Sequence, residues 1–139
     1  LSKSYLDWTR RNMALNEHAG GEHEYVNADA MTFLCNAPRT RLYDLAVVDP
    51  STFSNSKKTQ VDWDVQRDHV ALLRAVLNSM APGGLILFST NYRRFRLDED
   101  QLPEAGIREI TTQTVPPDFR NRRVHRCWEL RAKSRAPGS

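Results

Sequence analysis

Residues 43–57 read YDLAVVDPSTFSNSK, and this stretch decides the fold. Its first half is an apolar, β-branched run that ends at Asp49 and is stopped by Pro50. An uninterrupted apolar run predicts a strand buried on both faces, as in a parallel sheet. Ligands of open α/β sheets bind outside the carboxyl ends of the strands, so the polar loop after this strand is a candidate site. The same residues also suit a plain strand-ending turn.

The composition is that of an ordinary globular protein, with 40% hydrophobic and 27% charged residues among 139. This length predicts one compact domain. No apolar run approaches the roughly 20 residues that span a bilayer, and the first residues lack the layout of a signal peptide. Cys35 and Cys127 are too few for a disulfide framework and lack metal-ligand spacing. We therefore expect a cytoplasmic protein with no metal and no membrane partner.

Positive charge is concentrated in the last third of the chain. Residues 91–139 hold 11 Lys and Arg against 7 Asp and Glu, whereas residues 1–90 hold 9 against 10. A basic segment beside a nearly neutral one favours an acidic partner, most commonly nucleic acid. A solvated surface is the alternative, because the excess is modest.

Apolar periodicity predicts helices at about 4–16, at about 30–34 after an Asp29 cap, and at 65–80. The last of these has Asp62 or Asp64 as its N-cap and ends at Gly83-Gly84. Residues 98–105 predict a short acidic helix. Strands are expected at about 24–27, 42–48, 85–89, 107–114 and 124–130.

Strands that alternate with helices predict an α/β fold with a mainly parallel sheet. The two successive strands at the end predict an antiparallel hairpin at one edge. We expect residues 1–132 to form the C-terminal two-thirds of the domain and residues 133–139 to be a flexible tail. The chain does not begin with Met and opens on a helical pattern, which indicates a piece of a longer protein.

The chain resembles the class I S-adenosylmethionine-dependent methyltransferases in its strand-helix-strand unit, its Asp49-Pro50 and its final hairpin. More specifically, residues 53–57 (FSNSK) with 64–69 (DVQRDH), and the later residues 118–122 (DFRNR), resemble the C-terminal domain of the bifunctional bacterial 23S rRNA methyltransferases called RlmKL. The resemblance implies a Rossmann-like sheet of strand order 3-2-1-4-5-7-6. It also implies S-adenosyl-L-methionine as cofactor, 23S rRNA as partner, and guanine N7 as the methylated atom.

For the cofactor, the resemblance assigns Asp29 to the adenine amino group, Ala30 to the adenine ring through its N–H, and Leu1 to an apolar contact with adenine. It also counts Asp49 among the cofactor-binding residues. The ribose-binding acid and the glycine-rich loop of the family are absent from the sequence. We therefore expect a fold that lacks the first two strands, whose exposed edge the missing N-terminal part of the enzyme or a partner chain would complete.

For the substrate, the resemblance implies that Asp49 and Pro50 hold the target base as the catalytic residues. Ser51 departs from the family, which has a second proline there. Phe53 stacks on the guanine in this interpretation, or else packs under the loop. Asn55 and Lys57 contact the base edge and a phosphate, or are ordinary loop residues. Six arginines contact rRNA phosphates, or form a charged surface: Arg93, Arg94, Arg96, Arg120, Arg122 and Arg123.

The implied chemistry needs no general base, because guanine N7 carries a lone pair and no proton. His69 falls on the apolar stripe of its helix and is predicted to be a core histidine. A non-catalytic RNA-binding or interaction fragment is the rival interpretation, favoured by Ser51 and the absent glycine loop. A related RNA methyltransferase that acts on an exocyclic amine or on cytosine is a third. A cytosine C5 enzyme needs a nucleophilic cysteine near Asp49-Pro50, and we expect none there.

Overall fold

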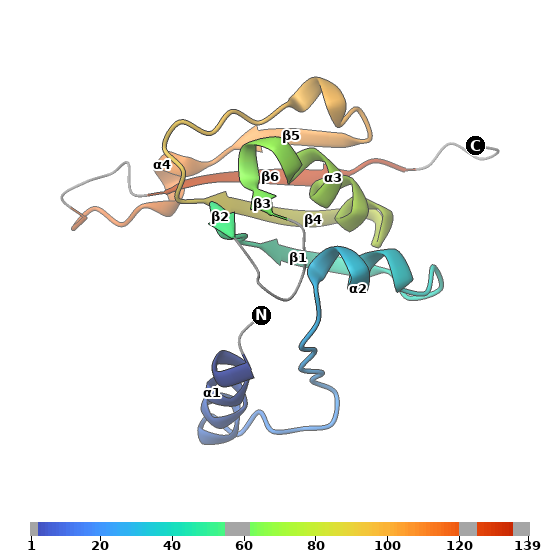
Figure 1. Ribbon diagram of the computed structural model, residues 1–139, viewed down its shortest axis with the longest axis vertical. Helices are drawn as coiled ribbons and strands as arrows, with labels where there is room; N and C mark the ends of the chain where they lie inside the picture. The colour runs from blue at the N-terminus through green and yellow to red at the C-terminus, as the bar shows by residue number, and fades with distance from the viewer. Residues whose placement is uncertain (1–2, 55–61, 120–124, 135–139) are drawn as a thin grey trace. The chain divides into compact units, whose positions relative to one another are not determined.

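The computed structural model describes residues 3–54, 62–119 and 125–134, and the chain divides into two compact units, Leu1–Asn36 and Ala37–Ser139 (Figure 1). In the first unit, helix α1 spans Lys3–Leu15 and helix α2 spans Ala30–Asn36. Asp29 caps α2 as expected, because its Oδ2 accepts from the amide of Thr32 at 2.9 Å and from its hydroxyl at 3.0 Å. The strand expected at 24–27 was wrong. Those residues are irregular, since no described strand pairs with them.

The second unit contains a sheet of four strands in the order β1-β4-β6-β5. Strand β1 spans Tyr43–Val48, β4 spans Met80–Thr90, β5 spans Ala105–Glu109 and β6 spans Arg126–Ala132. Strands β1 and β4 are parallel, and β6 lies antiparallel between β4 and β5. This order corresponds to strands 4-5-7-6 of the expected sheet, so the α/β class and the antiparallel pair at its edge are confirmed. The strand expected at 107–114 ends at Glu109 and is followed by a helical turn at Thr111–Thr114, and the helix expected at 98–105 is only the 3-10 turn Glu99–Gln101. Four short elements complete the unit: β2 (Phe53–Ser54), β3 (Trp63–Asp64), the 3-10 helix η1 (Glu99–Gln101) and α4 (Thr111–Thr114).

Helix α3, Val65–Asn78, connects β1 to β4 and covers one face of the sheet (Figure 1). One side of α3 is buried, as its 3.6-residue periodicity predicts. The buried residues are Val65, His69, Leu72, Leu73, Val76 and Leu77. The opposing sheet residues alternate along the strands with period two. They include Ile86 and Phe88 of β4 and Trp128 and Leu130 of β6, all at most 2% exposed. This helix-on-sheet layer is the hydrophobic core.

The end of α3 differs from its prediction, because the helix stops at Asn78 and not at Gly83-Gly84. Ser79 already belongs to the sheet region, where its carbonyl accepts from the amide of Tyr43 at 2.9 Å. The two glycines instead form a bulge in β4, where Met80 pairs with Tyr43 and Leu85 with Leu45. Gly83 has a φ of +77°, and a Cβ on Gly84 would lie 3.0 Å from the carbonyl oxygen of Tyr43.

Strand β1 is not buried on both faces, which was the expectation from its apolar run. Leu45 is 58% and Val47 is 70% exposed, and both lie on the face opposite α3. Among the described residues β4 is the only bonded neighbour of β1, so its other side is the open edge that the sequence predicted. Within the described ranges no helix is long and apolar enough to cross a membrane.

Candidate functional site

The candidate site begins where β1 and β4 end side by side. The Ser89 hydroxyl, next to the end of β4, donates a hydrogen bond of 2.8 Å to Oδ1 of Asp49, just after β1. By the alternation of side chains along the two strands, both residues lie on the side of the sheet opposite α3, and the Asp49 side chain is exposed. Among the described residues the carboxylate is therefore held at one oxygen, while the other oxygen and the remaining lone pair of Oδ1 have no partner there and can accept further bonds.

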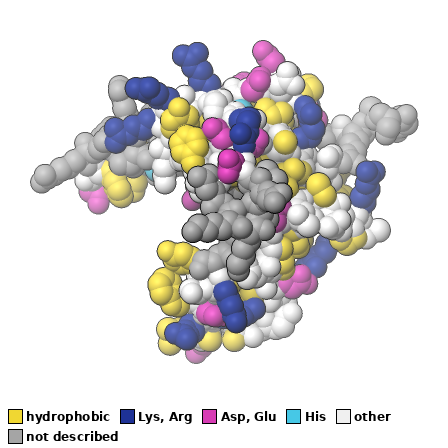
Figure 2. Space-filling view, in the orientation of Figure 1, with side chains coloured by type: hydrophobic (Ala, Val, Ile, Leu, Met, Phe, Trp, Pro, Cys, Tyr) yellow, Lys and Arg dark blue, Asp and Glu magenta, His cyan; other side chains and the backbone are white. Residues whose placement is uncertain are grey.

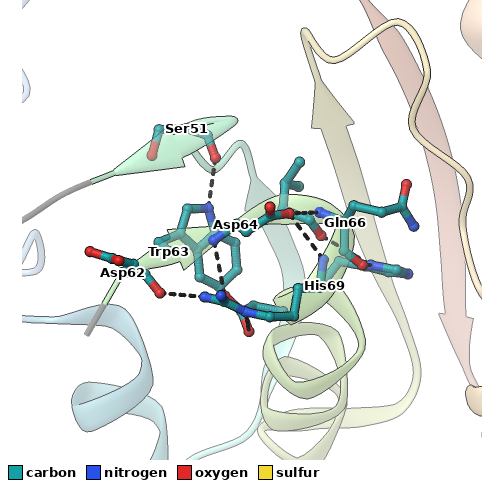
Figure 3. A network of polar contacts seen from close by, with 9 residues as sticks. Ser51, Asp62, Trp63, Asp64, Gln66 and His69 are labelled. Carbon is teal, nitrogen blue, oxygen red and sulfur yellow. Dashed lines mark hydrogen bonds and ion pairs between the residues drawn. The ribbon is translucent and has the colours of Figure 1, made fainter.

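Residues 51–53, which follow Asp49, are fixed to the start of α3 and to the residues just before it by hydrogen bonds to their backbone. The indole of Trp63 donates to the Ser51 carbonyl at 2.7 Å (Figure 3). The amide of Val65 donates to the Thr52 carbonyl at 3.0 Å, and Phe53 pairs with Asp64 in the small β2-β3 sheet. Ser51 therefore does not leave its part of the loop loose, because its carbonyl is a fixed acceptor.

Asp64 is the N-cap that anchors this arrangement, and Figure 3 shows its carboxylate directed at the first turn of α3. Its Oδ1 accepts from the amides of Gln66 at 2.9 Å and Arg67 at 3.1 Å. Asp68 bonds back to the cap residue, because its Oδ2 accepts from the Asp64 amide at 2.9 Å. Two orphan helix donors and the cap's own amide are thereby satisfied.

Arg67 holds the residue before β3 in place through hydrogen bonds to its carbonyl and to Asp68. Its Nη2 donates to the Asp62 carbonyl at 2.5 Å and to Asp68 Oδ2 at 2.8 Å, while its Nε donates to Asp68 Oδ1 at 3.0 Å. The hydrogen bond from Arg67 holds the pKa of the Asp68 carboxyl below its ordinary value, and the same bond raises the pKa of Arg67. This pair is partly solvated, so it fixes geometry more than it adds stability.

His69 is a core histidine, as predicted. It is 2% exposed, and its ring lies edge-on to Phe95 with centroids 4.7 Å apart. Its Nδ1 lies 3.0 Å from the Val65 carbonyl oxygen and 2.9 Å from that of Gln66, so Nδ1 carries the proton. Its Nε2 accepts from the Asp98 amide at 3.1 Å. Both nitrogens are used, and His69 is no general base.

The segment 92–98, which follows β4, carries the predicted phosphate contacts Arg93 and Arg94. Both side chains are exposed, and neither forms an ion pair with a residue that the structure describes. The segment itself is anchored, because Gln66 donates to the Arg96 carbonyl at 2.8 Å and accepts from the Arg96 amide at 2.9 Å. In the view of Figure 2, Lys and Arg side chains are dispersed among acidic and apolar ones. The predicted contact with RNA phosphates is therefore limited to single arginines such as Arg93 and Arg94 and does not extend over a broad basic surface in this view.

Phe53 lies at this site with 62% of its surface exposed, so it is not packed under the loop. Its ring neighbours Tyr92, with centroids 6.1 Å apart. Sequence reasoning missed Tyr92 and Ser89, because their positions depend on parallel strands ending together. It also missed the indole contact of Trp63, which forms within the connection between β1 and α3. Other predicted residues, among them Leu1, Asn55 and Lys57 and the arginines at 120, 122 and 123, lie outside the described residues.

Cys127 corrects one inference from the sequence, because a cysteine does lie near Asp49 in space. It pairs with Ser89 across the β4-β6 ladder. Burial raises the pKa of the Cys127 thiol, and the charges of Glu129 and Asp49 act in the same direction. A buried, protonated thiol is a poor nucleophile, so the cysteine does not favour cytosine C5 chemistry.

The sequence is similar to a group of curated rRNA-modifying enzymes. It is 46% identical over 134 residues to the ribosomal RNA large subunit methyltransferase K/L of Desulfotalea psychrophila, and 47% identical over 134 residues to that of Pseudomonas putida strain GB-1. Each match covers 96% of this chain. The resemblance predicted from the sequence is confirmed. The chain spans 18% of the length of these relatives, and no protein-family model matches it.

Solved structures confirm the class I methyltransferase fold. A SAM-dependent methyltransferase from Agrobacterium tumefaciens superposes with a TM-score of 0.68 at 15% identity, covering 95% of this chain and 46% of its own. A protein described as a methyltransferase complexed with SAH gives a TM-score of 0.70 at 19% identity, covering 95% of this chain and 37% of its own. At such identities the similarity concerns the fold.

Proposed function

We propose that this chain forms the base-holding part of an S-adenosylmethionine-dependent methyltransferase that modifies guanine N7 in 23S rRNA. The observation that carries the proposal is the Asp49 carboxylate, held by Ser89 where two parallel strands end, beside the exposed ring of Phe53. The similarity to the rRNA large subunit methyltransferases K/L supports the enzyme class and the rRNA substrate.

The residues suit a methyl transfer in which the protein positions the acceptor. The guanine N1–H and exocyclic amino group are donors on one edge, and Asp49 together with the Pro50 carbonyl offers acceptors for them. N7 lies on the other edge with a free lone pair, so no proton has to be removed before it attacks. The fixed negative charge of Asp49 also offsets the positive charge that the methylated ring acquires.

The cofactor contacts proposed in the first unit fit the chemistry of the residues there. S-adenosylmethionine, when bound, supplies an electrophilic methyl group. Asp29 Oδ2 already accepts from Thr32 at the start of α2, which fixes the carboxylate. Its Oδ1 has no partner among the residues that the structure describes and is the acceptor proposed for the adenine amino group. Ala30 is the first residue of α2, so its N–H has no partner within the helix.

The proposal is tested with the full-length protein that carries this sequence and unmethylated 23S rRNA made by transcription. Asp49→Ala should lower turnover by at least a hundredfold, measured as 7-methylguanosine by mass spectrometry, while binding of S-adenosylmethionine changes little. Asp44→Ala is the matched control, because Asp44 is an exposed acid of β1, the strand that leads to Asp49. Undiminished methylation by Asp49→Ala would contradict the proposed role.

A further inference from the structure

Tyr92 is an aromatic residue at the site that the proposed base contacts do not use. It follows β4, whereas Phe53 follows β1, and the two rings meet with centroids 6.1 Å apart and planes inclined by 60°. Because β1 and β4 are parallel neighbours, both rings lie at the edge of the sheet that carries Asp49.

Tyr92 is held in place by its own backbone and by the segment that follows it. Its amide donates to the hydroxyl of the fully buried Thr90 at 3.1 Å. Three residues on, the side chain of Phe95 is fully buried, and its carbonyl accepts from Arg126. The Asp98 amide is bonded to His69, so the segment is tied to both α3 and β6.

The Phe53 side of the pair is anchored to the same helix. Phe53 pairs with Asp64, the N-cap of α3, and the preceding Thr52 carbonyl accepts from the Val65 amide. Both rings are therefore carried by short segments fixed to the first turns of α3. Rings that are fixed before a ligand arrives lose little conformational entropy when they bind it.

We propose that Tyr92 stacks on the base next to the target guanine, so that the site takes an unstacked segment of at least two nucleotides. This inference rests on the proposed function. A single planar base cannot stack on two rings whose planes differ by 60°, so the pair suits two splayed bases. The exposed Arg93, directly after Tyr92, is placed to meet the phosphate that joins the two nucleotides.

The experiment uses the full-length protein and transcribed 23S rRNA. Tyr92→Leu removes the aromatic face and should raise KM for RNA about tenfold, in line with stacking energies measured for single aromatic residues. KM for S-adenosylmethionine and the melting temperature should not change. Tyr92→Phe keeps the ring and should behave as wild type. An RNA KM within twofold of wild type for Tyr92→Leu would overturn the inference.

A second measurement does not depend on how the Leu variant folds. Once mass spectrometry has located the modified guanine, abasic nucleotides are placed on either side of it in a short RNA. One of the two should weaken binding by the wild-type protein, and Tyr92→Leu should be insensitive to the same change. If the wild-type protein binds the unmodified RNA and the two abasic RNAs equally well, the inference is overturned. If Asp49→Ala remains active, the proposed function fails. If Asp49→Ala is inactive while Tyr92→Leu and the abasic RNAs behave normally, only the role of Tyr92 fails.

Discussion

The Ser89 hydroxyl donates a 2.8 Å hydrogen bond to the Asp49 carboxylate and thereby joins the ends of β4 and β1. The two residues are 40 positions apart in the sequence, yet the parallel pairing of Val48 with Phe88 places them side by side. The bond orients an otherwise exposed acid without burying its charge.

Ser89→Ala tests this orientation in the full-length protein. A hydrogen bond to a charged group contributes about 1.5–3 kcal/mol, and exposure of Asp49 places this one at the lower end. Turnover on 23S rRNA should therefore fall about tenfold, since 1.4 kcal/mol corresponds to a factor of ten. Ser89→Thr keeps the hydroxyl and serves as the control. Equal turnover by the Ala variant would mean that Asp49 needs no such support.

The chain of 139 residues should bind S-adenosylmethionine weakly or not at all. The sequence contains no glycine-rich loop, which in this fold brings the backbone close to the methionine part of the cofactor. Isothermal titration calorimetry of this chain measures the affinity directly. Micromolar binding would contradict the prediction.

Asp64→Ala should destabilise the protein by about 1 kcal/mol, because two amides at the start of α3 lose their acceptor. The measurement is urea unfolding followed by circular dichroism. Asp98→Ala is the matched control, since Asp98 occupies the N-cap position of η1 without a side-chain cap hydrogen bond. The free energy of unfolding of Asp98→Ala should differ from that of wild type by no more than about 0.5 kcal/mol. Equal losses in both variants would argue against a specific cap.

The contribution of Asp68 to stability should disappear in acid. Arg67 holds the pKa of the Asp68 carboxyl below its ordinary value of 3.8, so the folded state favours the ionised form. That stabilisation is complete above pH of about 4 and is lost as the pH falls through the lowered pKa. The melting temperature of Asp68→Asn should therefore lie below that of wild type at pH 7, and the difference should shrink below pH 4. A difference independent of pH would rule out this linkage.

Changing Arg93 and Arg94 together to Ala should make RNA binding less dependent on salt. Each phosphate contact to a single strand contributes about 0.7 to the slope of log affinity against log salt, so the slope should fall by about 1.4. Filter binding between 50 and 300 mM salt, roughly the range in which such slopes are read, measures it. Arg108→Ala is the control, because Arg108 is paired with Glu129 at 2.8 Å on the hairpin. An unchanged slope in the double variant would show that neither arginine contacts an RNA phosphate.

Local patterns in the sequence were sufficient for much of the fold. The 3.6-residue periodicity of 65–77 identified α3 and its buried face, including His69, because one side of a helix must be covered. The apolar runs identified β1 and β4, and the motifs around Asp49 and Asp64 led by resemblance to the curated rRNA methyltransferases that this chain is similar to. Errors arose where pairing overrode local preference. Residues 24–27 pair with no strand in the described part of the chain, and Gly83-Gly84 form a bulge in β4 instead of ending a helix.

What the sequence by itself determined is the long helix with a cap at Asp62 or Asp64, the two apolar strands on either side of it, and the strand end at Asp49-Pro50. These depend on the chemistry of residues within a few positions of each other. Tertiary structure alone decided that Ser89 holds Asp49, that Cys127 lies buried near them, and that Tyr92 stands beside Phe53. Each of these relationships depends on which strands are neighbours and in what register. That choice is made by the burial of α3 against the sheet, which no short stretch of sequence records.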